Sequence, residues 1–188
     1  MKQVFLNILD NAAKYGGDVA MVWIDAHPDI TLPGDPYPGY HAMAVTACMG
    51  HGDAKIVAEL PAAFDPSKIL FVGLRNWERG EIKARQHQYG IKHLTPEEVA
   101  ADSDALRAWL KSCGASKVVV HFDMDVLDPA EIVAAVGTDP DGMKIEAVIR
   151  VINDIAAEKE LVGLTVAEPM PRTAIRLRDM LGRLPLLE

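Results

Sequence analysis

One apolar run strongly limits what this chain can fold into, because it stops abruptly at two carboxylates and an imidazole. Residues 19–24 read Val-Ala-Met-Val-Trp-Ile and are followed directly by Asp25, His27 and Asp29 at alternate positions. A continuous apolar run of this length predicts a strand that is buried on both faces of a parallel sheet. Open α/β sheets place their sites at the carboxyl ends of such strands. Since alternate side chains of an extended segment point the same way, these three groups could converge on one metal centre if the chain stays extended past Ile24.

A second predicted strand, residues 117–122, ends in the same kind of motif. Asp123 and Asp125 follow it at alternate positions. The two strand ends together offer four carboxylates and one imidazole. This set of donors suits Mn²⁺ or a related divalent ion and is not that of a thiolate zinc site. Without a cation, four carboxylates at one place would repel one another, and not all would stay ionised. Because a carboxylate can bridge two ions, this set could hold a two-metal centre that makes hydroxide from bound water.

Strands and helices alternate along the rest of the chain. Further strands are expected at residues 69–74, 91–94 and 161–166, and helices are expected at residues 2–14, 42–49, 78–89, from 95 onward, 106–113, 145–156 and 177–184. This alternation predicts an α/β protein, a three-layer α/β/α sandwich with a mostly parallel sheet. No repeat, low-complexity tract or linker interrupts the pattern, so residues 1–188 are predicted to form a single domain.

Composition argues against several functional classes. The net charge of −8 argues against a nucleic-acid partner, which would need clustered Lys and Arg. No stretch of about 18 apolar residues is present that could span a membrane, and the first residues lack the pattern of a signal peptide. Cys48 and Cys113 cannot form a disulfide framework and make no Cys-x-x-Cys pair, so we interpret both as reduced thiols. We therefore expect a cytoplasmic protein.

The paired strand-end motifs resemble those of the arginase/ureohydrolase family, which includes arginases, agmatinases and formimidoylglutamases. The resemblance rests on residues 23–29, Trp-Ile-Asp-Ala-His-Pro-Asp, and residues 122–129, Phe-Asp-Met-Asp-Val-Leu-Asp-Pro, and it extends over nearly the whole chain. Family members use two manganese ions to hydrolyse guanidinium-type C–N bonds, and the arginase and agmatinase branches release urea. The resemblance thus implies an arginase-like fold, two Mn²⁺ ions, a small-molecule guanidino substrate and a homo-oligomer.

The resemblance also implies a role for each predicted ligand. Asp25 and Asp123 would bridge the two ions. His27 and Asp125 would complete one metal site. Asp29 would bind the other metal and accept a hydrogen bond from the bridging hydroxide, which attacks the guanidinium carbon.

Three more segments resemble family segments near the substrate. In residues 39–43, which are one residue shorter than the family segment, His41 would help a proton reach the leaving amine. Thr138 would lie near the substrate in a Gly-Thr loop, although the segment between Asp125 and this loop is one residue longer here. Glu168 would pair with the guanidinium, a task that suits a carboxylate because it can accept two parallel hydrogen bonds from a planar group.

One family motif has no counterpart in this sequence. Relatives carry Gly-Gly-Asp-His, or a variant with Cys, at the end of an earlier strand, and its last residue binds the same metal as Asp29. Here residues 16–18, Gly-Gly-Asp, precede the predicted strand instead of following one. The resemblance therefore implies an N-terminally truncated fold with one metal site short of a ligand. It also implies an uncovered sheet edge, which a longer natural chain or a second copy would cover.

The remaining histidines are not interpreted as replacements for the missing ligand. His51 is expected on a solvated turn, and His87 and His93 are expected on the surface. His121 lies inside a predicted strand, where packing or hydrogen bonding is the more common role of a histidine.

Three interpretations of function follow from these observations. The chain is a manganese-dependent hydrolase of a guanidino C–N bond, or a catalytically impaired relative that keeps the fold and part of the metal binding, or a purely structural α/β domain. The loop at residues 31–40 has no clear Asn/Ser pair that could hold an amino acid's carboxylate. The sequence therefore does not favour arginine over agmatine or another guanidino compound as the substrate.

Overall fold

The structure, a computed structural model, describes residues 8, 10–37 and 39–187. Its five strands form one sheet in the order β3-β2-β1-β4-β5, and each neighbouring pair is parallel. The strands are β1 (Val19–Ile24), β2 (Ile69–Val72), β3 (Lys92–Leu94), β4 (Lys117–Asp123) and β5 (Glu160–Ala167). The prediction of an α/β protein with a mostly parallel sheet is confirmed.

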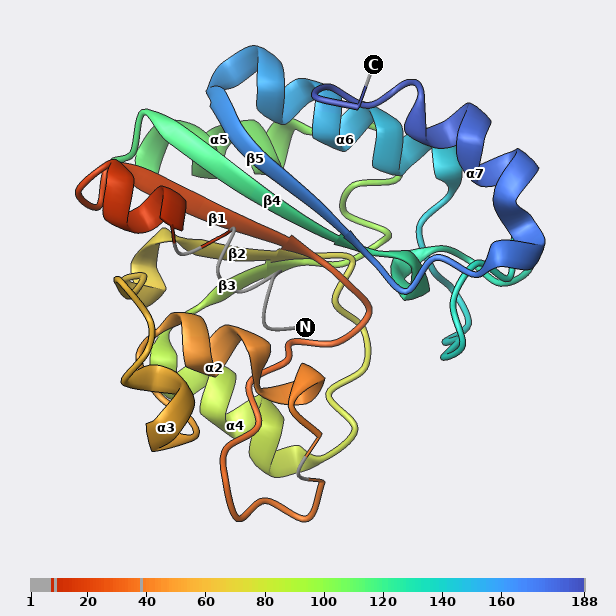
Figure 1. Cartoon of the computed structure of the whole chain (residues 1–188). Coiled ribbons are helices and arrows are strands. Elements are labelled where there is room, and N and C mark those ends of the chain that lie inside the picture. Colours follow the sequence, from red (N-terminus) through yellow and green to blue (C-terminus); the bar gives the residue numbers. More distant parts are fainter. Residues whose placement is uncertain (1–7, 9, 38, 188) are drawn as a thin grey trace.

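Helices cover both faces of this sheet (Figure 1). One face is covered by α2 (Ala44–Cys48) and α4 (Gly80–Tyr89), with α3 (Ala54–Val57) beside them. The other face is covered by α5 (Asp104–Ser112), α6 (Ile145–Glu158) and α7 (Ala174–Leu181). Short 3₁₀ turns lie between these elements: η1 (His41–Met43), η2 (Pro66–Lys68), η3 (Met124–Val126) and η4 (Pro171–Thr173). The predicted three-layer architecture is therefore confirmed.

Two apolar cores follow from the alternation of side chains along the buried strands. In β1, Ala20, Val22 and Ile24 face the core that contains residues of α5 and α6. Met21 and Trp23 face the opposite core, which contains residues of α2 and α4. Both faces are thus filled, which explains why this strand is apolar without interruption.

The prediction of a helix from residue 95 onward is wrong, because residues 96–99 form only a turn. Thr95 and Glu98 do cap each other: the Thr95 amide donates to Glu98 Oε2 at 2.7 Å, and the Glu98 amide donates to Thr95 Oγ1 at 3.3 Å. The Arg150 guanidinium of α6 then donates to the carbonyls of Ala100 and Asp102. A continuing helix would use those carbonyls for its own hydrogen bonds, so the chain begins a new helix at α5.

Two other helix predictions are modified by the structure. The helix predicted over residues 42–49 is divided into η1 and α2. Residues 10–14 are helical as predicted, whereas residues 1–7 and 9 of the helix predicted over residues 2–14 lie outside the described residues. None of the described helices is long and apolar enough to cross a bilayer.

The parallel arrangement brings the polar strand ends to one edge of the sheet. β1 and β4 are neighbours, with Trp23 opposite His121 and Ile24 opposite Phe122. β4 and β5 are neighbours in turn, so that Asp123 lies opposite the last residue of β5. The polar residues that follow β1, β4 and β5 therefore meet at the carboxyl edge.

Candidate metal centre

A cavity opens at this carboxyl edge and takes in both strand-end motifs. Seven of the eight predicted site residues line it: Asp25, His27, Asp29, His41, Asp123, Asp125 and Glu168. Thr138 is exposed and is not among the lining residues, although its neighbour Gly137 is. Residues from strand ends, from the loop after β1 and from the loop after β4 thus share one space.

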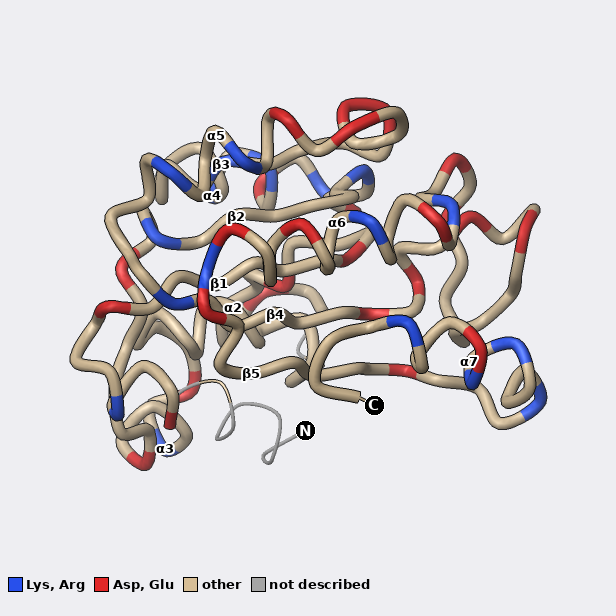
Figure 2. Tube along the Cα trace, turned by 90° about the horizontal axis from the view of Figure 1, so that it is seen from above, with Lys and Arg blue, Asp and Glu red and all other residues tan. Residues whose placement is uncertain are grey.

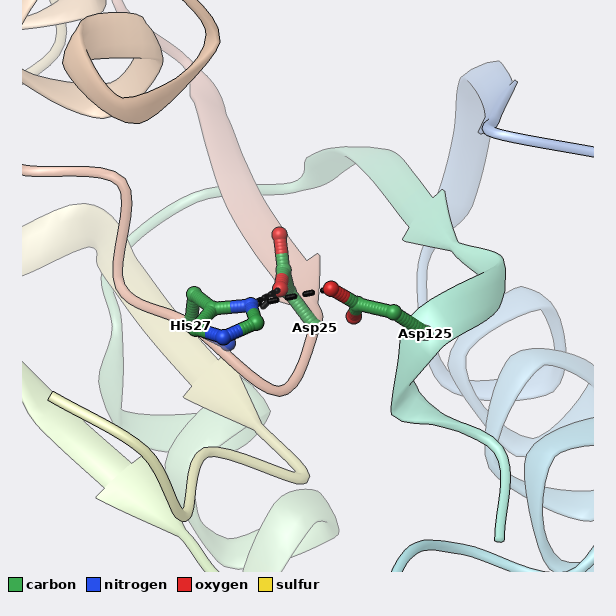
Figure 3. A group of neighbouring side chains, drawn as sticks. All are labelled: Asp25, His27 and Asp125. Atoms are coloured by element: carbon green, nitrogen blue, oxygen red, sulfur yellow. Dashed lines mark hydrogen bonds and ion pairs between the residues drawn. The ribbon is translucent and has the colours of Figure 1, made fainter. Parts of the chain in front are cut away.

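The first group of ligand atoms comes from Asp25, His27 and Asp125 (Figure 3). His27 Nδ1 lies 2.9 Å from Asp125 Oδ2 and 3.5 Å from Asp25 Oδ1. The Ala26 amide donates to Asp125 Oδ1 at 3.1 Å, which ties the end of β4 to the end of β1. One ligand atom from each of the three side chains lies within 4.8 Å of the others, which is close enough to hold a common ion.

The second group comes from Asp25, His121 and Asp123, whose ligand atoms also lie within 4.8 Å of one another. Asp25 belongs to both groups and is almost fully buried, at 2% exposure. The structure therefore offers two adjacent sets of donors that share one carboxylate.

Asp29 is in neither of these two groups, although it lines the same cavity as Asp25 and His27. The chain bends at residues 25–27 instead of staying extended. Asp25 Oδ1 accepts the His27 amide at 2.7 Å, and such a side-chain-to-backbone bond closes a turn. Asp29 itself has a φ of 48°, in the left-handed region.

The carboxylates of the cluster repel one another in the absence of a cation. Burial and the charge of Asp125 raise the pKa of Asp25 to about 7, although contacts with His27 lower it. Burial and the charges of Asp25 and Asp125 raise the pKa of Asp123 to about 9. Burial and the charges of Asp25 and Asp123 also raise the pKa of Asp29 well above its ordinary value. The cluster thus holds more carboxylates than it can keep ionised.

His27 supplies the positive charge that the cluster needs. Burial alone would lower the pKa of His27, but hydrogen bonds to Asp125 and Asp25, and the charges of both, raise it to about 11. The pKa of Asp125 is lowered, because the hydrogen bond and charge of His27 outweigh its burial. A divalent ion would replace this proton and neutralise the remaining carboxylates. Oxygen donors with one or two imidazoles fit Mn²⁺ or a similar ion.

The other ring nitrogen of His27 contacts Asp139 from the loop after β4. His27 Nε2 lies 3.1 Å from Asp139 Oδ2, and Asn76 Nδ2 donates to Asp139 Oδ1 at 2.7 Å. Arg75 donates to the backbone carbonyls of Asp139 and Asp125, at 2.9 and 3.0 Å. A metal-binding histidine commonly uses one nitrogen for the ion and donates the other N–H to a carboxylate. Sequence reasoning missed Asp139, because nothing local to its loop indicates a contact with His27.

His121 makes both kinds of contact that the sequence led us to expect. Its ring stacks on Trp23, with centroids 3.7 Å apart and planes 17° apart. Its Nδ1 lies 2.8 Å from Thr165 Oγ1. Burial lowers the pKa of His121 to about 3, so the ring is neutral.

The remaining histidines differ in their surroundings. His41 Nε2 lies 3.0 Å from the Tyr37 hydroxyl, and both side chains line the cavity. His51 and His87 are exposed, as expected. The expectation of a surface position for His93 is wrong: it is half-buried, with Nδ1 3.1 Å from Gln86 Nε2 and its ring edge-on to a tryptophan.

Comparison with known proteins identifies the family. The family model described as Arginase family matches residues 3–179. The chain belongs to the arginase family. Among curated relatives, the arginase of Entamoeba histolytica is 29% identical over 166 residues, which cover 86% of this chain and 55% of that protein. The N(omega)-hydroxy-L-arginine amidinohydrolase of Streptomyces lavendulae is 30% identical over 171 residues, which cover 88% of this chain and 56% of that protein.

Solved arginase structures have the same fold. The crystal structure of Entamoeba histolytica arginase in complex with L-ornithine superposes with a TM-score of 0.82 at 22% identity, covering 94% of this chain and 65% of that one. Arginase from Bacillus cereus gives a TM-score of 0.79 at 21% identity, with the same coverage. This arginase-family chain therefore spans a little over half the length of the two curated relatives above. Family membership and the two donor groups together indicate a divalent-metal site.

Asp139→Asn is expected to lower the affinity of this arginase-family chain for Mn²⁺ by about 10- to 100-fold, the usual effect of losing a partner that orients a metal-binding histidine. Asn keeps the size of the side chain but removes the charge that faces His27 Nε2. Isothermal titration with Mn²⁺ measures the change. Asp141→Asn is the matched control, because Asp141 is exposed in the same loop. Equal losses in the two variants would refute a specific role for Asp139.

The metal-free chain is expected to lose stability as the pH rises from about 4 to 9. The folded-state pKa values of Asp25 and Asp123 lie above those of an unfolded chain, so their contribution is fully present below about pH 4. It is lost as the pH rises through about 7 and 9, and the raised pKa of His27 acts in the same direction. Because metal binding releases these protons, the gap in melting temperature between Mn²⁺-loaded and metal-free protein should widen from pH 6 to 9. A constant gap would contradict this account.

Proposed function

We propose that this chain is a metal-dependent hydrolase that cleaves a C–N bond of a guanidino compound and uses two Mn²⁺ ions. One observation supports the proposal most directly: a single cavity is lined by His27, by the carboxylates of both donor groups and by the residues expected to handle substrate and protons, namely Asp25, His27, Asp29, His41, Asp123, Asp125 and Glu168. When bound, the two ions would supply an activated water at neutral pH.

The protein's own groups would position the substrate around that water. Glu168 would accept two parallel hydrogen bonds from the guanidinium and hold its carbon toward the carboxylates. Thr138 would contact the substrate at the mouth of the cavity, beside Gly137. His41, whose ring is bonded to the Tyr37 hydroxyl, would deliver a proton to the leaving amine. Asp29 would accept a hydrogen bond from the attacking water.

Metal-ligand roles are proposed for the remaining acidic groups and for His27. Asp25 would hold both ions, which is consistent with its membership of both donor groups. Asp123 would be the second bridging carboxylate. His27 and Asp125 would complete one site, with His27 binding through Nδ1 because Nε2 faces Asp139.

The direct test is product release by the purified chain with Mn²⁺ added. Arginine, agmatine and N(omega)-hydroxyarginine are offered separately, and urea or hydroxyurea and the product amine are quantified. Metal content is determined on the same samples. Turnover of one of these compounds, lost on chelation and restored by Mn²⁺, is the expected result. Stoichiometric Mn²⁺ without turnover of any of them would contradict the proposal.

That negative outcome would favour a catalytically impaired family member that keeps the fold and part of the metal binding. One observation favours this second candidate: Asp29 lies outside both donor groups.

We also propose that the protein forms a homo-oligomer in the cytoplasm. β5 is an edge strand, and its apolar side chains are only half-buried: Leu161, Val162, Leu164 and Val166. Light scattering after size-exclusion chromatography would measure the oligomeric state.

Lys and Arg are interspersed with Asp and Glu along the described chain (Figure 2), unlike the basic stripe of a nucleic-acid-binding protein.

A further inference from the structure

The second donor group includes a histidine for which the resemblance to the family gives no role. It contains Asp25, Asp123 and His121. Sequence reasoning assigned His121 to packing or hydrogen bonding, because it lies inside a predicted strand. Yet it is the only imidazole in the second group, just as His27 is the only one in the first.

We propose that His121 is a metal ligand, and that Asp25, Asp123 and His121 form the second cation site of this chain. This inference rests on the proposed function in one respect only, namely that the protein binds two divalent ions. It supplies a protein nitrogen to the second donor group.

The sheet geometry directs the three side chains to the same place. His121 and Asp123 occupy alternate positions of β4, so both project to the same face. Trp23 lies opposite His121 in the register with β1, and Asp25 follows two residues later. A ring nitrogen of His121 and one oxygen of each carboxylate lie within 4.8 Å of one another.

The imidazole is held as a metal-binding histidine usually is. It is 96% buried, being 4% exposed. The Nδ1 atom of His121 lies 2.8 Å from Thr165 Oγ1, within hydrogen-bond distance. This contact leaves Nε2 as the nitrogen that would bind the ion. The stacked Trp23 ring fixes the plane of the imidazole, and Trp23 Nε1 donates to Asp25 Oδ2 at 2.9 Å. One tryptophan therefore orients both the proposed nitrogen ligand and the carboxylate shared by the two sites.

The alternative is that His121 is only a packed core residue, and metal stoichiometry distinguishes the two. Purified protein is equilibrated with excess Mn²⁺, passed through a desalting column, and assayed for Mn²⁺ per chain. Electron paramagnetic resonance of the same samples detects whether two ions are spin-coupled. We expect two coupled ions in the unmodified chain and one uncoupled ion in His121→Asn.

The matched control is His93→Asn, since His93 is also partly buried, bonded to a side chain and in contact with a tryptophan ring. It should retain two coupled ions. Thr165→Val keeps the imidazole but removes its hydrogen bond, so it should bind two ions with weaker affinity for the second. If His121→Asn folds poorly, His121→Gln and a His121→Gly variant supplied with free imidazole replace it. Recovery of the second ion with added imidazole is expected for His121→Gly.

Two results would overturn the inference: two coupled ions in a folded His121→Asn or His121→Gln protein, or a single ion in the unmodified chain that depends on His27 and not on His121. Neither readout uses catalysis. A chain that binds two ions through His121 but hydrolyses no guanidino compound would contradict the proposed function alone. A chain that turns over substrate while its His121 variants keep both ions would contradict this inference alone.

Discussion

The Asp123→Asn variant is expected to lose both Mn²⁺-dependent stabilisation and hydrolysis. At a hundredfold excess of Mn²⁺ over Kd, binding to the folded state stabilises it by about 2.7 kcal/mol. For a domain of this size, that corresponds to a rise of roughly 5–10 °C in melting temperature. Asp123 belongs to the second donor group and is 8% exposed, so its loss would remove a proposed ligand that solvent cannot replace without rearrangement. Turnover should fall by about a thousandfold or more, as expected when charge stabilisation at the reacting centre is lost.

The metal-free form of this variant should behave in the opposite way. Burial and the charges of Asp25 and Asp125 disfavour an ionised Asp123, so a neutral amide there should leave the metal-free protein as stable as the unmodified one or more so. Thermal unfolding of the unmodified protein and of Asp123→Asn, each with Mn²⁺ and with chelator, gives the four melting temperatures that the comparison needs. Asp141→Asn serves as the control for a change of charge on an exposed loop. A normal Mn²⁺-dependent shift in Asp123→Asn would remove this residue from the metal centre.

Glu168→Gln should lower kcat/KM for a guanidino substrate by about a hundredfold or more and leave Mn²⁺ binding unchanged. The amide has nearly the same shape as the carboxylate but cannot accept two hydrogen bonds from a guanidinium with charge assistance. A loss of about 3 kcal/mol corresponds to this factor. Glu168 lines the cavity and lies outside both donor groups, which is why binding of substrate and binding of metal should separate.

Steady-state kinetics and isothermal titration with Mn²⁺ on the same preparation provide that separation. Glu160→Gln is the matched control, because Glu160 begins the strand that Glu168 follows and is exposed. Glu160 forms an ion pair with Lys117 near the surface, and such pairs contribute little to stability. If Glu168→Gln turns over substrate normally, another group must bind the guanidinium.

The sheet and most members of the two donor groups could be predicted from the sequence because both depend on short-range patterns. A strand buried on both faces reads as an apolar run, which β1 shows over its whole length and β4 shows at residues 118–120. Parallel strands bring their carboxyl ends to one edge, so Asp25 and Asp123 could be placed together from two separate motifs. The grouping of Asp25, His27 and Asp125 needed no further information.

What could not be predicted depends on contacts between distant segments or on a single backbone angle. The bend after Ile24 and the left-handed φ of Asp29 move that carboxylate out of the expected alternation. Asp139 reaches His27 from a distant loop, which Arg75 and Asn76 hold in place through hydrogen bonds. A helix at Thr95 was predicted from its capping residues, but those residues close a single turn just as well.

The alternation of side chains in the sheet separates the row that leads into the proposed metal ligands from the row that only packs in a core. The proposed ligands of β1 and β4 continue the same row as Met21, Trp23 and Val119, which belong to the core beneath α2 and α4. The neighbouring row, with Val22 and Val120, belongs to the core beneath α5 and α6. The sheet would therefore separate substitutions in the α5–α6 layer from the proposed ions. Tuning of ion preference would fall to the α2–α4 layer, so the two halves of the molecule can diversify at different rates.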